Sequence, residues 1–161
     1  MIDKELLRST VAGSISGTDL FIVNISVSPA NDIVVELDSS TSVDIDTCAA
    51  VTRAVEEVFD RDAEDYSLEV GSAGITSDFK VRGQYDKNIG NDVEILTRDG
   101  RKLRGVLTAV APGAVTDTDV DFTVEITSKV KEPGAKRPVM RTEAFDFRSA
   151  DCKYVRYDLK F

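Results

Sequence analysis

The sequence predicts an α+β protein of two domains, and three observations on its 161 residues lead to that expectation. Charge divides the chain, because residues 1–75 carry four Lys and Arg against fifteen Asp and Glu, whereas residues 76–161 carry sixteen against fourteen. The first part mixes helical spacing with strand-like alternation, and the second part shows alternation alone. We therefore expect an acidic α/β domain at residues 1–82 and an all-β domain at residues 83–161.

The first domain should open with a helix and a β-hairpin. Apolar residues at helical spacing indicate a helix that begins near Ile2 and stops at Gly13. These apolar positions are Ile2, Leu6, Leu7 and Val11. Alternating apolar residues then indicate strands at 20–27 and 33–37, and turn-forming residues at 28–32 join them.

A second helix is expected over residues 43–59, because apolar residues recur there every three or four positions. The hydroxyls of residues 39–42 offer N-caps, and Asp44 and Asp46 in the first turn suit the positive end of the helix dipole. Residues 66–70 alternate as a third strand. The resulting order, α-β-β-α-β, is typical of two helices packed on one face of a three-stranded sheet.

The second domain should consist of short strands. Apolar runs at 93–97 and 103–110 flank Asp99-Gly100, which is a strong hairpin signal, and Gly105 inside the second run predicts a bulge or sharp bend. Later alternating runs lie at 120–126, at 145–147 and at 155–161. Four or five short strands with a central bend predict a small SH3-like (Sm-like) β-barrel.

Four small residues separate the two patterns: Gly71, Ser72, Ala73 and Gly74. Consecutive N–H groups in such a turn can bind a phosphate, but the stretch lacks the Gly-Lys-Ser/Thr that ends a nucleotide-binding loop. No clear helix is expected directly after it. We therefore interpret these residues as a hinge between the domains.

A basic stretch lies between two of the predicted strands. Its cations are Lys129, Lys131, Lys136, Arg137 and Arg141, and they surround Glu132-Pro133-Gly134. Since alternating strands bracket this stretch, we expect an exposed loop. It is either a solvated hairpin tip or a set of candidate contacts to RNA phosphates in a ribosome or free RNA.

The sequence offers little to support catalysis, a metal site or a cofactor. It contains no histidine, no nucleotide-binding fingerprint and no obvious carboxylate pair. Residues 117–121 resemble the opening of a calcium loop, but Phe122 and Ser128 stand where that loop requires Gly and a carboxylate. We therefore expect no enzyme activity, no cofactor and no metal.

The cysteines and the hydropathy pattern indicate a cytoplasmic protein without a membrane segment. Cys48 and Cys152 are 104 positions apart in apolar patterns, as expected of buried reduced thiols. No apolar run approaches the length of a membrane span, and the first residues do not follow the order of a secretion signal. The acidic first domain should repel a polyanion and attract a basic protein.

Several segments carry a resemblance to a known family. Ser42–Asp60 resembles the second helix of the ribosome maturation factor RimP family. Tyr66–Gly74 is similar to the family signature Tyr-x-Leu-Glu-Val-Ser-Ser-Pro-Gly, with Gly71 and Ala73 in place of Ser and Pro. Thr76–Phe79 departs from the Arg-Pro-Leu run of many members. Further matches are Phe79, Tyr85, Asn88, Gly90, Val93, Ile95, Gly100, Lys102, Leu103, Gly105 and Leu107.

The resemblance implies an α/β N-terminal domain, an SH3-like C-terminal barrel and a non-enzymatic assembly factor, and we expect a monomer. RimP-like proteins are expected to bind the immature small (30S) ribosomal subunit in the bacterial cytoplasm and to assist its late maturation. The implied partners are a basic ribosomal protein near the decoding centre, 16S rRNA, or both. Residues 110–151 match the family least well, so the resemblance assigns no role to the basic stretch.

Two other functions stay open at the level of the sequence. A general RNA-binding module would use the basic stretch and the barrel, and it would bind naked RNA with a strong dependence on salt. An enzyme on a small barrel scaffold is the other alternative, which the absence of a recognisable catalytic constellation disfavours.

Overall fold

The computed structural model describes residues 1–75 and 77–159, which form two compact units. The first unit ends at Gly74 and the second begins at Ile75, whereas the sequence placed the boundary after residue 82. Phe79 and Val81 belong to the second unit because they pack there. Phe79 packs against the second apolar core and its N–H donates to the carbonyl of Val155 at 2.7 Å, while Val81 is buried.

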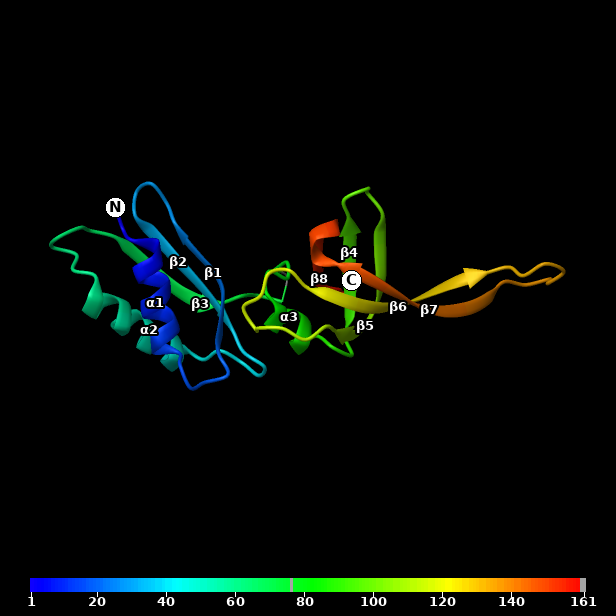
Figure 1. The fold of residues 1–161 in the computed structure, drawn as a ribbon, viewed down its shortest axis with the longest axis horizontal. Coiled ribbons are helices and arrows are strands. Elements are labelled where there is room, and N and C mark those ends of the chain that lie inside the picture. Colours follow the sequence, from blue (N-terminus) through cyan, green and yellow to red (C-terminus); the bar gives the residue numbers. More distant parts are fainter. Residues whose placement is uncertain (76, 160–161) are drawn as a thin grey trace. The chain divides into compact units, whose positions relative to one another are not determined.

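The first unit is an α+β sandwich with a three-stranded sheet (Figure 1). Its elements are α1 (Lys4–Ser14), β1 (Phe21–Val27), β2 (Asp32–Asp38), α2 (Ile45–Val58) and β3 (Ser67–Ser72). The sheet order is β1-β2-β3, with β1 antiparallel and β3 parallel to the central strand β2. The predicted order of elements, α-β-β-α-β, is confirmed.

The core of this unit lies between the two helices and the sheet. Leu7 and Val11 of α1 and Val51 and Val55 of α2 are almost completely buried. They pack with alternate residues of β2, which are Ile33, Val35 and Leu37. Leu6 was expected in the apolar stripe but is 46% exposed, because it precedes the buried Leu7 by one position and so lies on a different side of the helix.

The N-cap residues of α1 and α2 are aspartates rather than serines. Asp3 accepts hydrogen bonds from the N–H groups of Glu5 and Leu6, and Asp44 accepts one from Thr47 at 2.7 Å. The expectation that residues 39–42 cap α2 was wrong. Ser39 is buried and its hydroxyl donates to the carbonyl of Ser42, so it is engaged before the helix begins.

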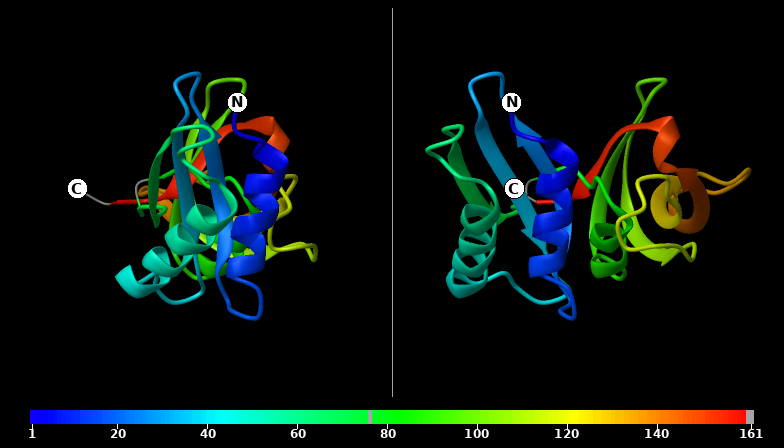
Figure 2. Two further views of the ribbon diagram at one scale, coloured as in Figure 1. Left: turned by 90° about the vertical axis from the view of Figure 1, so that its left-hand side faces the viewer. Right: turned by 60° about the vertical axis from the view of Figure 1, so that its left-hand side comes forward.

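The second unit is built on a five-stranded antiparallel sheet (Figures 1 and 2). Its elements are α3 (Arg82–Lys87), β4 (Asp92–Thr97), β5 (Lys102–Val110), β6 (Asp121–Val130), β7 (Val139–Arg148), the 3₁₀ turn η1 (Ser149–Asp151) and β8 (Cys152–Tyr157). The strand order is β7-β6-β5-β4-β8, and among the described residues no pairing joins β7 to β8. The sheet is therefore open, and the expected closed barrel is not confirmed.

Two further expectations for this unit need correction. The short helix α3 was not expected, because its sequence carries no apolar period. The register irregularity of β5 lies between Leu107 and Ala109 rather than at Gly105. Gly105 has a different role, since a Cβ there would collide with the backbone carbonyl of Glu125 on β6.

The second core is centred on aromatic rings that fix β6 against α3 and β7. Tyr85 of α3 lies 5.0 Å from Phe122 between ring centroids, and Phe122 stacks on Phe147 of β7 at 5.7 Å. Tyr85 is only 2% exposed, and burial raises the pKa of its hydroxyl above the ordinary value. This packing holds the base of the β6–β7 hairpin.

Candidate binding surfaces

The β6–β7 hairpin extends beyond the rest of its sheet (Figure 1). Its ladder continues to the pair Val130 and Val139, whereas β5 pairs with β6 only as far as Glu125. We call residues 126–143 the ribbon, which consists of two paired strand ends and the loop between them. Because β5 does not support it, the ribbon exposes most of its side chains to solvent.

The ribbon carries all five cations that the sequence singled out. Lys129 and Arg141 lie in the strands, and Lys131, Lys136 and Arg137 lie in the loop. The exposed loop is therefore shorter than expected, because β6 and β7 both extend further than the alternation indicated. The Arg141 side chain pairs with Glu132. Within the described residues the other four cations form no ion pair, and all five are exposed.

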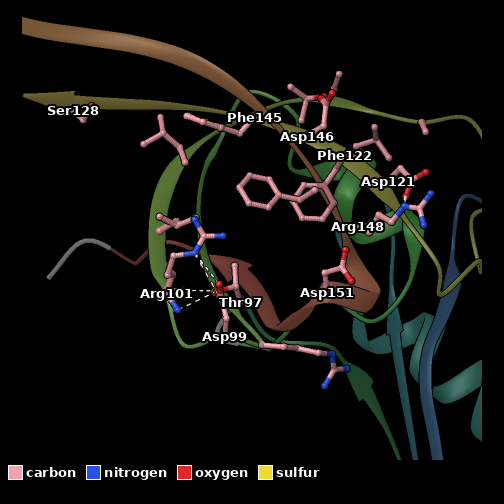
Figure 3. Close-up of a pocket in the computed structure, with 18 residues that line it drawn as sticks. Thr97, Asp99, Arg101, Asp121, Phe122, Ser128, Phe145, Asp146, Arg148 and Asp151 are labelled. Atoms are coloured by element: carbon pink, nitrogen blue, oxygen red, sulfur yellow. Dashed lines mark hydrogen bonds and ion pairs between the residues drawn. The ribbon is translucent and has the colours of Figure 1, made fainter. Parts of the chain in front are cut away.

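A groove of about 1100 Å³ lies beside the base of the ribbon (Figure 3). Its apolar lining comes from β5, β6 and β7 and consists of Leu103, Val110, Phe122, Ile126, Phe145 and Phe147. Phe145 is 43% exposed, which is unusual for a large apolar ring. Such an open apolar groove can accept a side chain or a short segment of a partner.

The charged rim of this groove is paired within itself. Arg101 contacts Asp99 at 3.2 Å and Arg148 contacts Asp121 at 3.7 Å between their nearest charged atoms. Arg98, which also lies on the rim, donates from Nε to the carbonyl of Ala150 at 2.6 Å. The rim therefore has little net charge to attract a polyanion.

The first unit presents an acidic surface. All of its fifteen acidic residues except Glu36, Asp38 and Glu64 are exposed. Glu64 pairs with the N-terminal amine and accepts a hydrogen bond from the Asn31 side chain at 3.0 Å, and these contacts hold its pKa below the ordinary value. An exposed surface with this charge favours a basic partner.

A compact charge network lies on β4, β5 and β8. Glu94 is 9% exposed, and its carboxylate lies 3.0 Å from Lys102 Nζ and 3.1 Å from Arg104 Nη2. Arg156 approaches the same carboxylate at 3.7 Å and also lies over the ring of Tyr154. The hydrogen bond from Lys102, followed by that from Arg104, holds the pKa of Glu94 below its usual range despite burial.

Arg82 is a buried cation that sequence reasoning missed. It is 4% exposed, and its guanidinium donates to the carbonyls of Ala111 and Asp119 and to the carboxylate of Asp117. Its Nε has no hydrogen-bond partner among the described atoms. No local signal marks it, because its partners lie 29 to 37 residues away. Arg82 ties α3 to the segment that leads into β6.

The four predicted hinge residues do not all lie outside the sheet. Gly71 and Ser72 form the end of β3 and pair with Glu36 and Leu37 of β2. The N–H of Ala73 donates to the carbonyl of Leu37 at 2.8 Å, so the backbone of the first unit is held up to this point. Three of the four residues are therefore held by the sheet of the first unit, and the hinge itself stays a prediction.

The two cysteines and the calcium-like stretch at residues 117–121 have structural roles. Cys152 is buried and Cys48 is half-buried, although both were expected to be buried, and neither forms a disulfide. Burial is the main cause that raises the pKa of both thiols. Asp117 accepts the Arg82 hydrogen bond, which lowers its pKa, so the calcium-like stretch serves to anchor a loop.

Within the described part of the chain, no group of three or more Cys, Asp or Glu side chains is placed to hold a metal ion. None of the described helices is long and apolar enough to span a membrane.

Comparison with known proteins gives a consistent result. Residues 10–76 match the family model described as "RimP N-terminal domain". The chain is 40% identical over 153 residues to a protein named ribosome maturation factor RimP from Porphyromonas gingivalis, covering 95% of this chain and 96% of the relative. It is 32% identical over 126 residues to the protein of the same name from Flavobacterium psychrophilum, covering 78% and 75% respectively. A third relative so named, from Christiangramia forsetii, is 36% identical over 90 residues, covering 56% and 59%.

Proposed function

The chain belongs to the RimP family of ribosome maturation factors, and from this premise we propose that it binds the immature small (30S) ribosomal subunit and assists its late assembly without catalysing a reaction. The observation that carries the proposal is the 40% identity to a ribosome maturation factor over 95% of this chain. The match spans both units, so the proposal concerns the whole protein. We place the activity in the cytoplasm and expect a monomer.

The charge of the first unit supports a protein partner. An exposed acidic surface accelerates and orients encounters with basic proteins, and ribosomal proteins are abundant basic partners. We propose that this surface engages a basic ribosomal protein near the decoding centre or the site where that protein docks. The second unit supplies the separate cationic contact described above, to protein or 16S rRNA.

An assembly factor must leave the particle when the site has matured. Directionality requires a higher affinity for the immature particle than for the mature one, since a factor that binds both equally shifts no equilibrium. We propose that the segment from Gly74 onward lets the two units engage their contacts independently. NMR relaxation would report two different tumbling times, and a single rigid tumbling time would contradict this.

The test of the proposed function is co-sedimentation of the full chain with ribosomal particles. We expect it in the fractions of free and precursor small subunits and at much lower occupancy on translating ribosomes. With purified components, precursor small subunits should bind at least tenfold more tightly than mature ones. Absence from small-subunit fractions under growth conditions would contradict the proposal.

The exposed cations of the ribbon favour a second candidate function, that of a general RNA-binding module. Such a module would bind naked RNA as tightly as it binds a particle. Competition separates the two: an excess of unrelated single-stranded RNA should leave particle binding unchanged if the protein is an assembly factor, and should abolish it for a general RNA binder.

The finer fold of the second unit is part of the proposal. We propose that its sheet is related to the SH3-like barrel, in a form that is open between β7 and β8. The register irregularity in β5 and the 3₁₀ turn before the last strand support this relationship. An experimental structure of the complex would reveal whether a partner strand closes the gap.

A further inference from the structure

The ribbon is a two-stranded element without a third strand to support it. Beyond Glu125 each strand adds five paired residues, which is about 17 Å at roughly 3.4 Å per residue. An isolated two-stranded hairpin is only marginally stable in water. We therefore expect the ribbon to be stabilised by contact with a binding partner.

The two faces of the ribbon differ in chemistry. Thr127 pairs with Thr142 and Lys129 pairs with Met140, so these four side chains share one face. The two threonine hydroxyls are 2.7 Å apart and exposed, and the exposed Lys129 belongs to the same face. Apart from Met140, this face offers only hydroxyls and positive charge. The opposite face carries Ile126, the exposed carboxylate of Glu143 and the Arg141 side chain, whose charge Glu132 compensates.

The free cations of the ribbon point to a phosphate-rich partner. Lys129, Lys131, Lys136 and Arg137 are exposed and form no ion pair within the described part of the chain. The protein as a whole is acidic, with a formal charge of −9 that includes the cations of the ribbon. Attraction to a polyanion is therefore confined to this element, whereas attraction to a basic protein is supplied by the first unit.

The composition of the ribbon distinguishes between kinds of RNA. Residues 126–143 contain no aromatic residue, and single-stranded RNA is bound largely by stacking its bases on aromatic rings. Double-stranded RNA is instead recognised by its shape, through phosphates and the 2′-hydroxyls of a wide and shallow minor groove. Lysines and threonines on an exposed ribbon suit those groups.

We propose that the ribbon docks on the backbone of double-stranded RNA, with the Thr127 and Thr142 face toward the minor groove and Lys129 and the loop cations on the flanking phosphates. This inference deepens the proposed function and rests on it, because the duplex would be part of the rRNA in the immature particle. It assigns the RNA contact to the ribbon and leaves the groove at its base free for a different contact.

The test uses the full chain and a 20-base-pair RNA duplex, with affinity measured by fluorescence anisotropy at several salt concentrations. The ribbon variants are Lys131→Gln with Lys136→Gln, and Lys129→Gln with Arg137→Gln. The matched control is Lys80→Gln with Lys153→Gln, which removes the same charge from exposed positions of the second unit outside the ribbon. All of these side chains are exposed, so the variants should fold, and their NMR spectra check this.

Each ribbon variant should lose at least tenfold in affinity for the duplex, and the control should stay within twofold of the unchanged protein. The slope of log affinity against log salt should fall by about 1.5 to 2 for two lost phosphate contacts. An equal loss in the control would overturn the proposal, because it would report net charge alone. Tighter binding to a single strand of the same length would also overturn it.

Co-sedimentation of the same variants with precursor small subunits separates this inference from the proposed function. If the unchanged protein does not bind the particles, the proposed function fails. If it binds and the ribbon variants bind equally well, the ribbon inference alone fails. If the ribbon variants lose the particles but keep the RNA duplex, the ribbon contacts a ribosomal protein and the inference is overturned.

Discussion

The guanidinium Nη2 of Arg82 lies 3.1 Å from the carboxylate Oδ2 of Asp117, although 35 residues separate them in the chain. Arg82 is nearly inaccessible to solvent, and it connects α3 with the segment that leads into β6. Gly113 lies directly over the guanidinium, where any Cβ would collide with it. One buried side chain therefore fixes a long segment that has no regular structure of its own.

Replacement of Arg82 tests this arrangement. Arg82→Lys should lower the free energy of unfolding of the second unit by about 2–4 kcal/mol, because Lys lacks the planar set of donors and leaves buried carbonyls without partners. Urea unfolding followed by NMR signals of β4 and β6 measures the change. The control is Arg137→Lys at an exposed position, with an expected change below about 0.5 kcal/mol. Equal stability of the two variants would contradict the anchor.

Gly105 should be intolerant of a side chain. A Cβ at this position would meet the backbone carbonyl of Glu125, which the β5–β6 ladder holds in place, so Gly105→Ala should cost about 2 kcal/mol or more. Gly71→Ala is the control, since nothing lies within 4 Å of a Cβ there. Its thermal midpoint should stay close to that of the unchanged protein. A stable Gly105→Ala variant would contradict the close approach of β5 and β6.

The network around Glu94 should make stability depend on pH. Its pKa is lower in the folded protein than in the unfolded chain, so the stabilisation is complete above the unfolded value of about 4.5 and is lost as the pH falls through the folded value. Glu94→Gln should therefore be less stable at pH 7, by about 1–2 kcal/mol, and should flatten the decline between pH 5 and pH 3. Unfolding free energies at several pH values measure this. Glu125→Gln, at an exposed position, should retain the original profile.

The identity of the α2 cap can be tested directly. Asp44→Ala should destabilise the first turn of α2, because it removes the acceptor for the N–H of Thr47, whereas Ser42→Ala should have little effect. Hydrogen exchange of the first-turn amides should accelerate only in the first variant. The hydrogen bonds from Thr47 lower the pKa of Asp44, so the protection in the unchanged protein should weaken in acid. Faster exchange in Ser42→Ala would favour the cap that the sequence indicated.

The acidic surface should contribute to particle binding. Glu56→Gln with Glu57→Gln removes two exposed charges from α2 without touching the core, and it should weaken binding to precursor small subunits about three- to tenfold. The control, Asp86→Asn with Glu125→Gln, removes two exposed charges from the second unit. The loss should shrink at high salt, since exposed charges are screened. Equal effects of both variants would contradict a specific role for the first unit.

Local pattern was sufficient to predict most elements of this protein. The alternation in β1, β2, β4 and β5, the period of α2 and the Asp99-Gly100 turn are each properties of residues close in sequence, and the structure shows all of them. The uneven charge of the two parts was also visible without a structure. Family membership followed from short segments in a fixed order, which the comparisons confirm.

The sequence by itself determined most of the segments that become helices and strands, where charge accumulates and to which family the chain belongs. Only the tertiary structure decided that Arg82 is buried and that Asp44 caps α2. It also decided that the sheet of the second unit stays open and that β6 and β7 extend beyond β5 to form the ribbon. The physical reason is range: backbone propensity depends on a few adjacent residues, whereas burial, strand pairing and the partners of a buried charge depend on residues that folding brings together from far along the chain.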